Sequence, residues 1–108
     1  MHKNDIIHRD LKSLNVFLTK DYNAKIGDMG AAKDITNRTE SKFLSQVGTP
    51  YYLSPEVWKS QAYSTKSDIW ALGWILYELC TLEKPFLADT QEDLIYTILQ
   101  GEYILYVY

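Results

Sequence analysis

Apolar and polar residues alternate or recur at short intervals along most of the chain, and this pattern predicts a series of short elements. Residues 6–7 are an apolar pair that indicates a short strand. Residues 16–19 and 24–26 are rich in β-prone side chains, and the turn-like residues 20–23 between them predict a hairpin. Residues 31–47 are polar and show no period, which predicts a loop.

The second half of the chain has helical spacing. A proline opens a short helix predicted over residues 55–58, because proline is favoured at the first helical position. Residues 69–82 are apolar almost all round, which predicts a helix buried on every face and therefore the centre of the core. Apolar residues recur at helical spacing in 94–99, with a capping signal at Thr90 and a stop at Gly101, and predict another helix.

Length and composition limit the kind of protein. The 108 residues allow one domain at most, and 46% apolar with 23% charged residues is ordinary for a globular protein. The net charge is −3 and no basic block occurs, so neither a nucleic acid nor a membrane surface is an expected partner. The chain has neither a signal-peptide core nor an apolar run of membrane-spanning length, so a cytoplasmic location is the default expectation.

Two apolar features lie outside the main pattern. The single cysteine, Cys80, lies in an apolar helical run, so we expect a small core residue rather than a reactive thiol. Residues 103–108 are uncharged, β-prone and free of proline. Left exposed, they would favour aggregation.

The chemistry is concentrated in residues 8–15, which read HRDLKSLN. They fit the protein-kinase catalytic-loop pattern H-R-D-L-x-x-x-N at every fixed position, a match expected by chance about once in a few million starts. Asp28-Met29-Gly30 follows where D-F-G is expected, and Ser54-Pro55-Glu56 where A-P-E is expected. The chain therefore resembles part of a protein kinase over about residues 1–102.

Within that family the chain is most similar to the NIMA-related group of serine/threonine kinases. The phrases that carry the similarity are HRDLKS and NVFL within residues 8–18, GTPYYLSPE at 48–56, KSDIWALG at 66–73 and LCTL at 79–82. The resemblance implies an α+β fold, namely the mostly helical C-terminal lobe of the kinase fold with a short β-hairpin after the catalytic loop. The N-terminal lobe would be absent, residues 1–102 would form a partial kinase domain, and 103–108 a divergent tail.

The resemblance also implies transfer of a phosphoryl group from ATP, with Mg²⁺, to serine or threonine of protein substrates. Asp10 is the candidate base that accepts the substrate hydroxyl proton, and Lys12 would place its charge near the transferred group. Thr49 would bridge these two residues. An isolated Asp in a loop more often caps a turn. However, Asp10 occurs together with Asn15 and Asp28 at the spacing of the family.

The nucleotide and its metal would be held by residues on both sides of the predicted hairpin. Asn15 and Asp28 are candidate Mg²⁺ ligands, because magnesium prefers oxygen donors. Together with Lys12 they are the candidate nucleotide-binding residues. Phe17 would line the adenine pocket. Met29 replaces the usual phenylalanine and is expected to fill the same packing position.

Four more residues have expected structural or regulatory roles. His8 would pack in the core beneath the site, and Arg9 would bind a phosphate on the following loop, the alternative being an ordinary surface arginine. Asp68 resembles the residue that holds the catalytic-loop backbone, and a plain helix N-cap is compatible with that role. Glu56 would lack its usual arginine partner, which belongs to a region outside this sequence.

Phosphorylation is expected on the loop before residue 48. Ser45 is the first candidate, with Thr39 and Ser41 behind it, and an unmodified polar residue is the alternative at each position. A phosphate on Ser45 would dock on Arg9 and order the loop.

Three functional hypotheses follow. The first is a serine/threonine kinase whose isolated 108-residue segment is inactive. The second is a catalytically dead, truncated kinase-like binding module. The third, an unrelated small α/β binding protein, requires the motif matches to be accidental. Without flanking helices, the helix over 69–82 would leave apolar surface bare, so self-association is expected.

Overall fold

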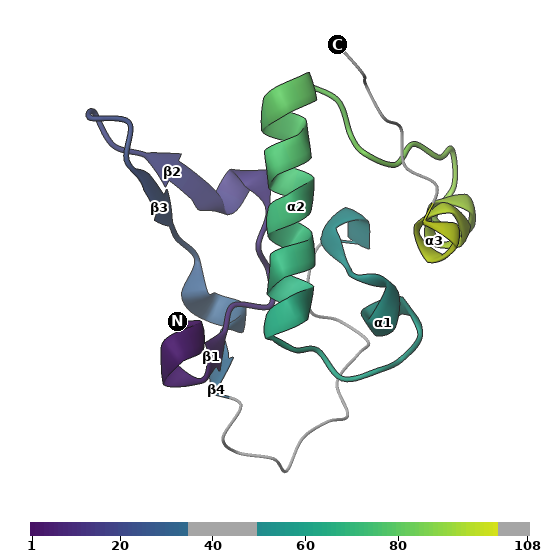
Figure 1. Ribbon diagram of the computed structural model, residues 1–108, viewed down its shortest axis with the longest axis horizontal. Helices are drawn as coiled ribbons and strands as arrows, with labels where there is room; N and C mark the ends of the chain where they lie inside the picture. Colours follow the sequence, from purple (N-terminus) through teal and green to yellow (C-terminus); the bar gives the residue numbers. More distant parts are fainter. Residues whose placement is uncertain (35–49, 102–108) are drawn as a thin grey trace.

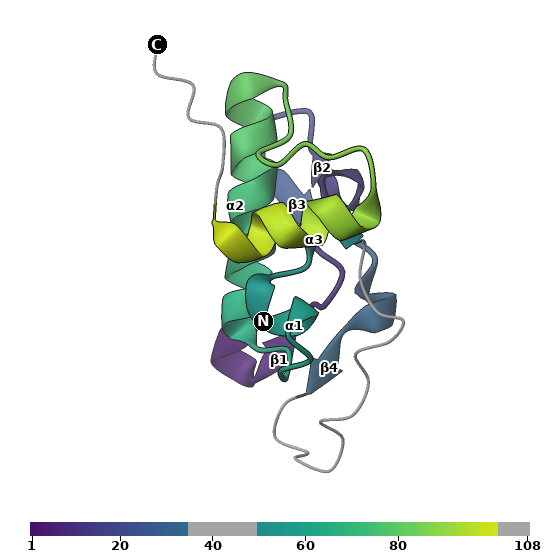
Figure 2. The same cartoon turned by 90° about the vertical axis from the view of Figure 1, so that its right-hand side faces the viewer.

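The computed structural model describes residues 1–34 and 50–101. Figure 1 shows helix α2 (Thr65–Thr81) standing in the middle, with the strands on one side and helices α1 (Pro55–Trp58) and α3 (Gln91–Gln100) on the other. Seen from the side in Figure 2, α3 runs across α2. The mixture of helices and antiparallel strands agrees with the expected α+β class.

The strands form two separate antiparallel pairs. β2 (Val16–Leu18) pairs with β3 (Ala24–Ile26), which is the predicted hairpin. β1 (Ile6–Ile7) was also predicted, and it pairs with β4 (Lys33–Asp34). β4 lies in the stretch predicted to be a loop, so that prediction was wrong there. Lys and Asp have low strand propensity, so a strand of these residues forms only where it can pair with another strand, which here is β1.

Single turns of 3₁₀ helix connect these elements. They are η1 (His2–Asn4), η2 (Ser13–Asn15), η3 (Met29–Ala31) and η4 (Pro50–Tyr52). η2 leads directly into β2, and η3 follows soon after β3, so both turns lie at the open end of the hairpin.

The helices begin and end at capping residues. α2 starts four residues before its predicted limit, because Ser64 caps it: the Ser64 hydroxyl accepts from the Lys66 amide at 3.2 Å, and Ser67 Oγ accepts from the Ser64 amide at 3.2 Å. The apolar pattern could not reveal this polar first turn. α3 has the predicted cap and stop, since Thr90 Oγ1 accepts from the Asp93 amide at 3.1 Å and Gly101 adopts φ 74°.

The core consists of two clusters joined by one tyrosine. Both clusters use the same side of α2, and Tyr52 packs against both. The first contains Trp74, Phe86, Leu94 and Ile98, and the second contains Leu11, Ala71 and Ile75. Leu11, in the candidate catalytic segment 8–15, is therefore anchored on α2.

The other side of α2 is open, which corrects the prediction of a helix buried all round. Ile69, Leu72, Leu76 and Leu79 are 52%, 38%, 62% and 71% exposed, and we call these four residues the open face of α2. The molecule measures 44 × 39 × 19 Å, and about 19 Å holds only two helix layers. Cys80 is exposed for the same reason, so its expected place in the core was wrong. No helix within residues 1–34 and 50–101 is long and apolar enough to cross a membrane.

Candidate functional site

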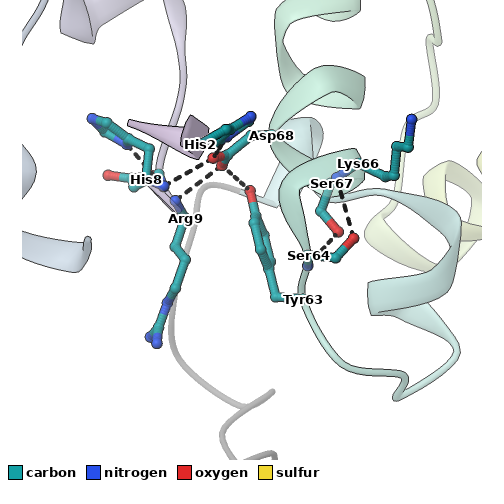
Figure 3. Close-up of polar contacts among 9 residues, drawn as sticks. His2, His8, Arg9, Tyr63, Ser64, Lys66, Ser67 and Asp68 are labelled. Carbon is teal, nitrogen blue, oxygen red and sulfur yellow. Dashed lines mark hydrogen bonds and ion pairs between the residues drawn. The ribbon is translucent and has the colours of Figure 1, made fainter. Parts of the chain in front are cut away.

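Asp68, in the first turn of α2, binds the backbone at the start of the segment 8–15 (Figure 3). Its carboxylate accepts hydrogen bonds from the backbone N–H groups of His8, at 2.9 Å, and Arg9, at 3.1 Å. The Tyr63 hydroxyl donates to the same carboxylate at 3.0 Å, and His2 Nε2 lies 2.7 Å from it. Asp68 is completely buried, and these partners replace the water that its charge would otherwise bind.

The backbone that Asp68 holds has an unusual conformation. Arg9 adopts φ 71°, a left-handed value that is uncommon for a residue with a side chain. The hydrogen bond from its N–H to Asp68 helps to hold that conformation. In Figure 3 the Arg9 side chain extends away from Asp68. Asp68 is not the N-cap of α2, since Ser64 has that position, so the plain-cap alternative was wrong.

His8 is buried beneath the loop and makes contacts in two directions. Its Nε2 lies 3.0 Å from the carbonyl oxygen of Gly27, and its Nδ1 lies 3.3 Å from the amide nitrogen of Asp10. A carbonyl only accepts and an amide N–H only donates, so these contacts require the ring hydrogen on Nε2. His8 thus connects the loop to the end of the hairpin.

The candidate catalytic pair is formed within the loop itself. Lys12 Nζ lies 2.9 Å from Asp10 Oδ2, and both side chains are partly exposed. Asn15 supports both residues, because its Nδ2 donates to the Asp10 carbonyl at 2.9 Å and its backbone N–H donates to the Lys12 carbonyl at 2.9 Å. A carboxylate and an ammonium group are thereby held together at the surface.

The two candidate metal ligands lie at the open end of the hairpin. The Gly27 amide, next to Asp28, donates to the Asn15 carbonyl at 2.8 Å, which ties the two ends together. Asn15 is buried, whereas Asp28 is exposed in a left-handed conformation, with Oδ1 accepting from the Gly30 amide at 3.4 Å. One amide oxygen and one carboxylate suit magnesium. The described ranges contain no group of three or more His, Cys, Asp or Glu that could hold a metal, so a cation here needs further oxygens from a ligand or water.

Phe17 presents an aromatic surface beside these residues. Its ring lies directly over Gly27, where an added Cβ would be only 2.6 Å from Phe17 Cε2, and the side chain is 56% exposed. Gly27 is therefore needed for the ring to lie there. Met29 is 47% exposed, so the expected packing of its side chain is not seen, because the residues around it leave it uncovered.

Glu56 was expected to lack its usual arginine partner, and the partner that the structure gives it is a serine. Ser67 Oγ donates to Glu56 Oε1 at 2.8 Å, so α2 holds the start of α1. Burial acts to raise the pKa of Glu56. Hydrogen bonds from its own backbone N–H and from the Ser67 hydroxyl help to outweigh burial, so that the pKa of Glu56 lies below its ordinary value.

Sequence reasoning missed several contributors. His2 and Tyr63 reach Asp68 through space, and no spacing rule connects them to it. The hydroxyl of Tyr52 lies 3.0 Å from both Ser13 Oγ and Glu78 Oε2 and bridges the loop to α2. A hollow of about 520 Å³ opens beside this bridge, lined by Ser13, Ile75, Glu78, Leu79, Leu82, Glu83, Lys84 and Leu87.

Some predicted residues cannot be placed. Thr49, Ser45, Thr39 and Ser41 lie outside the residues that the structure describes, as do residues 103–108.

Comparison with known proteins gives a consistent result. The family model described as Protein kinase domain matches residues 1–107. Serine/threonine-protein kinase Nek1 of Mus musculus is 48% identical over 103 residues, which cover 95% of this chain and 8% of Nek1. Nek3 of Mus musculus is 48% identical over 101 residues (94% of this chain, 20% of Nek3). Nek2 of Homo sapiens is 49% identical over 98 residues (91% of this chain, 22% of Nek2). The chain thus spans less than a quarter of each of these relatives.

Proposed function

This chain belongs to the protein kinase domain family, and from that premise we propose that the protein transfers the γ-phosphoryl group of ATP to serine or threonine of protein substrates. The expected resemblance to the NIMA-related group is confirmed by relatives that carry the Nek name. The observation that carries the proposed activity is the Asp10–Lys12 pair, at 2.9 Å, on a loop whose backbone is held by buried Asp68.

Asp10 and Lys12 act together in the proposed reaction. Asp10 accepts the proton of the substrate hydroxyl as that oxygen attacks phosphorus, and the bond from phosphorus to the leaving oxygen of ADP breaks. Lys12 orients the Asp10 carboxylate before the substrates bind, and it offers positive charge to the phosphoryl oxygens during transfer. Thr49 is proposed to bridge these two side chains.

Nucleotide and metal would bind at the open end of the hairpin. When bound, magnesium neutralises phosphate charge during the transfer. Asn15 and Asp28 would supply its protein oxygens, and the hydrogen bond from the Gly27 amide to the Asn15 carbonyl supports their nearness. Phe17 offers its exposed ring to the adenine base, and Lys12 adds charge on the phosphate side.

The finer assignments belong to the same proposal. Residues 1–102 correspond to the C-terminal lobe of the kinase fold and 103–108 to a divergent tail. Phosphorylated Ser45 docks on Arg9, whose side chain points away from Asp68 and is available for an anion. The proposed location is cytoplasmic.

A non-catalytic alternative has one observation in its favour. The open face of α2 is apolar and uncovered in this chain, which suits a binding module or self-association. In this hypothesis the loop at residues 8–15 would serve only to position a docking surface, and phosphoryl transfer would be absent.

Phosphoryl transfer tests the proposal directly. We would incubate the full-length natural protein that contains this segment with γ-labelled ATP, Mg²⁺ and a Ser/Thr-containing protein substrate. Asp10→Asn is expected to reduce transfer at least a hundredfold, since it removes the proton acceptor. Asp21→Asn, a matched change in the exposed hairpin turn, should leave transfer unchanged. Transfer that survives Asp10→Asn would contradict the role given to Asp10 as the proton acceptor. The absence of transfer in the unmodified protein would favour the non-catalytic alternative.

A further inference from the structure

We propose that Tyr52 is a positioning residue for the catalytic loop: its hydroxyl joins Ser13 to Glu78 and so keeps Asp10 and Lys12 in place. This inference rests on the proposed kinase function and extends it to Tyr52, Ser13 and Glu78, to which no role in the reaction has been given above. Tyr52 lies in η4, Glu78 in α2, and Ser13 directly follows Lys12.

The direction of the hydrogen bonds can be deduced from their chemistry. The Tyr52 hydroxyl lies 3.0 Å from Glu78 Oε2, and an ionised carboxylate can only accept, so Tyr52 donates its hydrogen there. The Tyr52 oxygen must then accept from Ser13, whose Oγ lies at 3.0 Å and whose backbone nitrogen lies at 3.5 Å. The bonds therefore run from Ser13 to Tyr52 to Glu78.

The ring of Tyr52 is a firm anchor. It packs against both core clusters, and its centroid lies 5.6 Å from that of Trp74. Burial is the largest effect and raises the pKa of Tyr52; the hydrogen bonds from Ser13 lower it and the Glu78 carboxylate raises it, with a net rise above the ordinary value. The hydroxyl therefore keeps its hydrogen at neutral pH. An anchored ring with a protonated hydroxyl can fix whatever binds to its oxygen.

What it fixes is the turn that carries the candidate catalytic groups. Ser13 begins η2, whose Asn15 supports the carbonyl groups of both Lys12 and Asp10. Ser13 and Leu14 are exposed, so this part of the turn has little apolar packing to hold it. A hydrogen bond at Ser13 therefore limits the movement of Lys12 more than one at a packed residue would.

The bridge also borders solvent, because Ser13 and Glu78 line the 520 Å³ hollow. When Ser13 or Tyr52 loses its hydroxyl, water can reach the polar groups that were bonded to it. No buried polar group is then left without a hydrogen-bond partner. Removal of the bridge should thus leave the fold intact and affect mainly the order of the loop.

The test compares four single variants of the full-length natural protein and the double variant Tyr52→Phe/Ser13→Ala. Tyr52→Phe and Ser13→Ala each remove one hydroxyl, Ser13→Thr retains it, and Tyr51→Phe is the matched control, since its ring contacts with Lys84 and Trp74 need no hydroxyl. Amide hydrogen exchange over residues 12–15 reports loop order, and kcat and KM for a protein substrate report its effect.

We expect Tyr52→Phe and Ser13→Ala to raise the exchange rate of the Asn15 amide about fivefold and to lower kcat by a similar factor, with KM changed less than twofold. The double variant should fall no further than Tyr52→Phe alone, because the two hydroxyls act through one bond. Ser13→Thr and Tyr51→Phe should behave like the unmodified protein.

Two results would overturn the proposal: unchanged exchange over residues 12–15 in Tyr52→Phe, or additive losses in the double variant. Failure of the kinase function looks different. In that case no variant transfers phosphate, and the exchange measurement alone decides whether Tyr52 orders the loop.

Discussion

At the scale of single residues, Asp68 has the largest effect on the geometry of the site. It is fully buried, and two of its four partners are backbone N–H groups of consecutive residues, His8 and Arg9. Those donors cannot rotate away or find water if the carboxylate is lost. The backbone of the candidate catalytic loop therefore depends on a buried residue of α2.

Replacement of Asp68 by Asn should be strongly destabilising. An amide retains one accepting oxygen, and its NH₂ group would face a backbone N–H, which leaves at least one buried donor without a partner. We expect the free energy of unfolding to fall by about 2–3 kcal/mol, measured by chemical denaturation. Asp89→Asn, an exposed residue before α3, is the control, and an equal loss in both variants would contradict the assigned role.

Glu56 gives a pH dependence at the same scale. Its pKa is lower in the folded protein than its ordinary value near 4.5, so the native state favours the ionised form. The stabilisation is complete above pH about 4.5 and is lost as pH falls through the folded-state pKa. On acidification, the unfolding midpoint of Glu56→Gln should therefore fall less than that of the unmodified chain. An equal fall in both proteins would contradict the proposed contribution of ionised Glu56 to stability.

At the scale of elements, the β2–β3 hairpin brings Asn15 and Asp28 together. The return of the chain is short, and the Gly27 amide closes it on the Asn15 carbonyl. The same glycine leaves room for the Phe17 ring, so one residue determines both the closure and the aromatic surface next to it.

Gly27→Ala should disturb this hairpin. The new Cβ would lie 2.6 Å from Phe17 Cε2, so the ring must turn away, at an expected loss of about 1–2 kcal/mol. Nucleotide affinity of the full-length protein should fall at the same time, as measured by calorimetry. In the background of Phe17→Ala the added methyl group meets no ring, so there Gly27→Ala should have little effect on stability.

Elements with a local signal were predictable, whereas contacts between distant segments were not. The hairpin and α3 were found because turn residues and the Thr90 cap mark their limits within a few positions. The pair of β1 with β4 was missed because its second strand is polar and forms only on a partner. The contacts of His2 and Tyr63 with Asp68 are likewise set by the tertiary fold, and a pattern of neighbours along the chain cannot encode them.

At the scale of the whole molecule, the two-layer thickness explains the exposed apolar surface. A helix that reads as apolar on all sides was expected to be wrapped, but the described elements cover only one side of α2. The four residues of the open face are separated by three, four and three positions along the chain. Apolar residues have this spacing where two helices of a coiled coil contact each other. The sequence predicted the bare surface correctly and the depth of burial incorrectly, because burial depends on which other segments are present.

The 108-residue chain should therefore self-associate through this face. Sedimentation velocity is expected to show dimers or larger species, because about four large side chains would leave water together. Leu76→Glu should shift the chain toward the monomer, while Tyr96→Glu, a similarly exposed position on α3, should not. An unmodified chain that is monomeric and unfolds in a cooperative thermal transition would contradict this prediction.

The hydrogen bond between the His8 amide and Asp68 also has a consequence for the order of events during synthesis. The two residues are 60 positions apart. At about 5–20 residues per second, a ribosome needs roughly 3 to 12 seconds to add the second after the first. Throughout that interval the nascent HRD segment has no carboxylate to hold its backbone. A translation product that stops before α2 would contain the complete HRDLKSLN segment. Without Asp68, however, the backbone of that segment would not be held in its folded conformation.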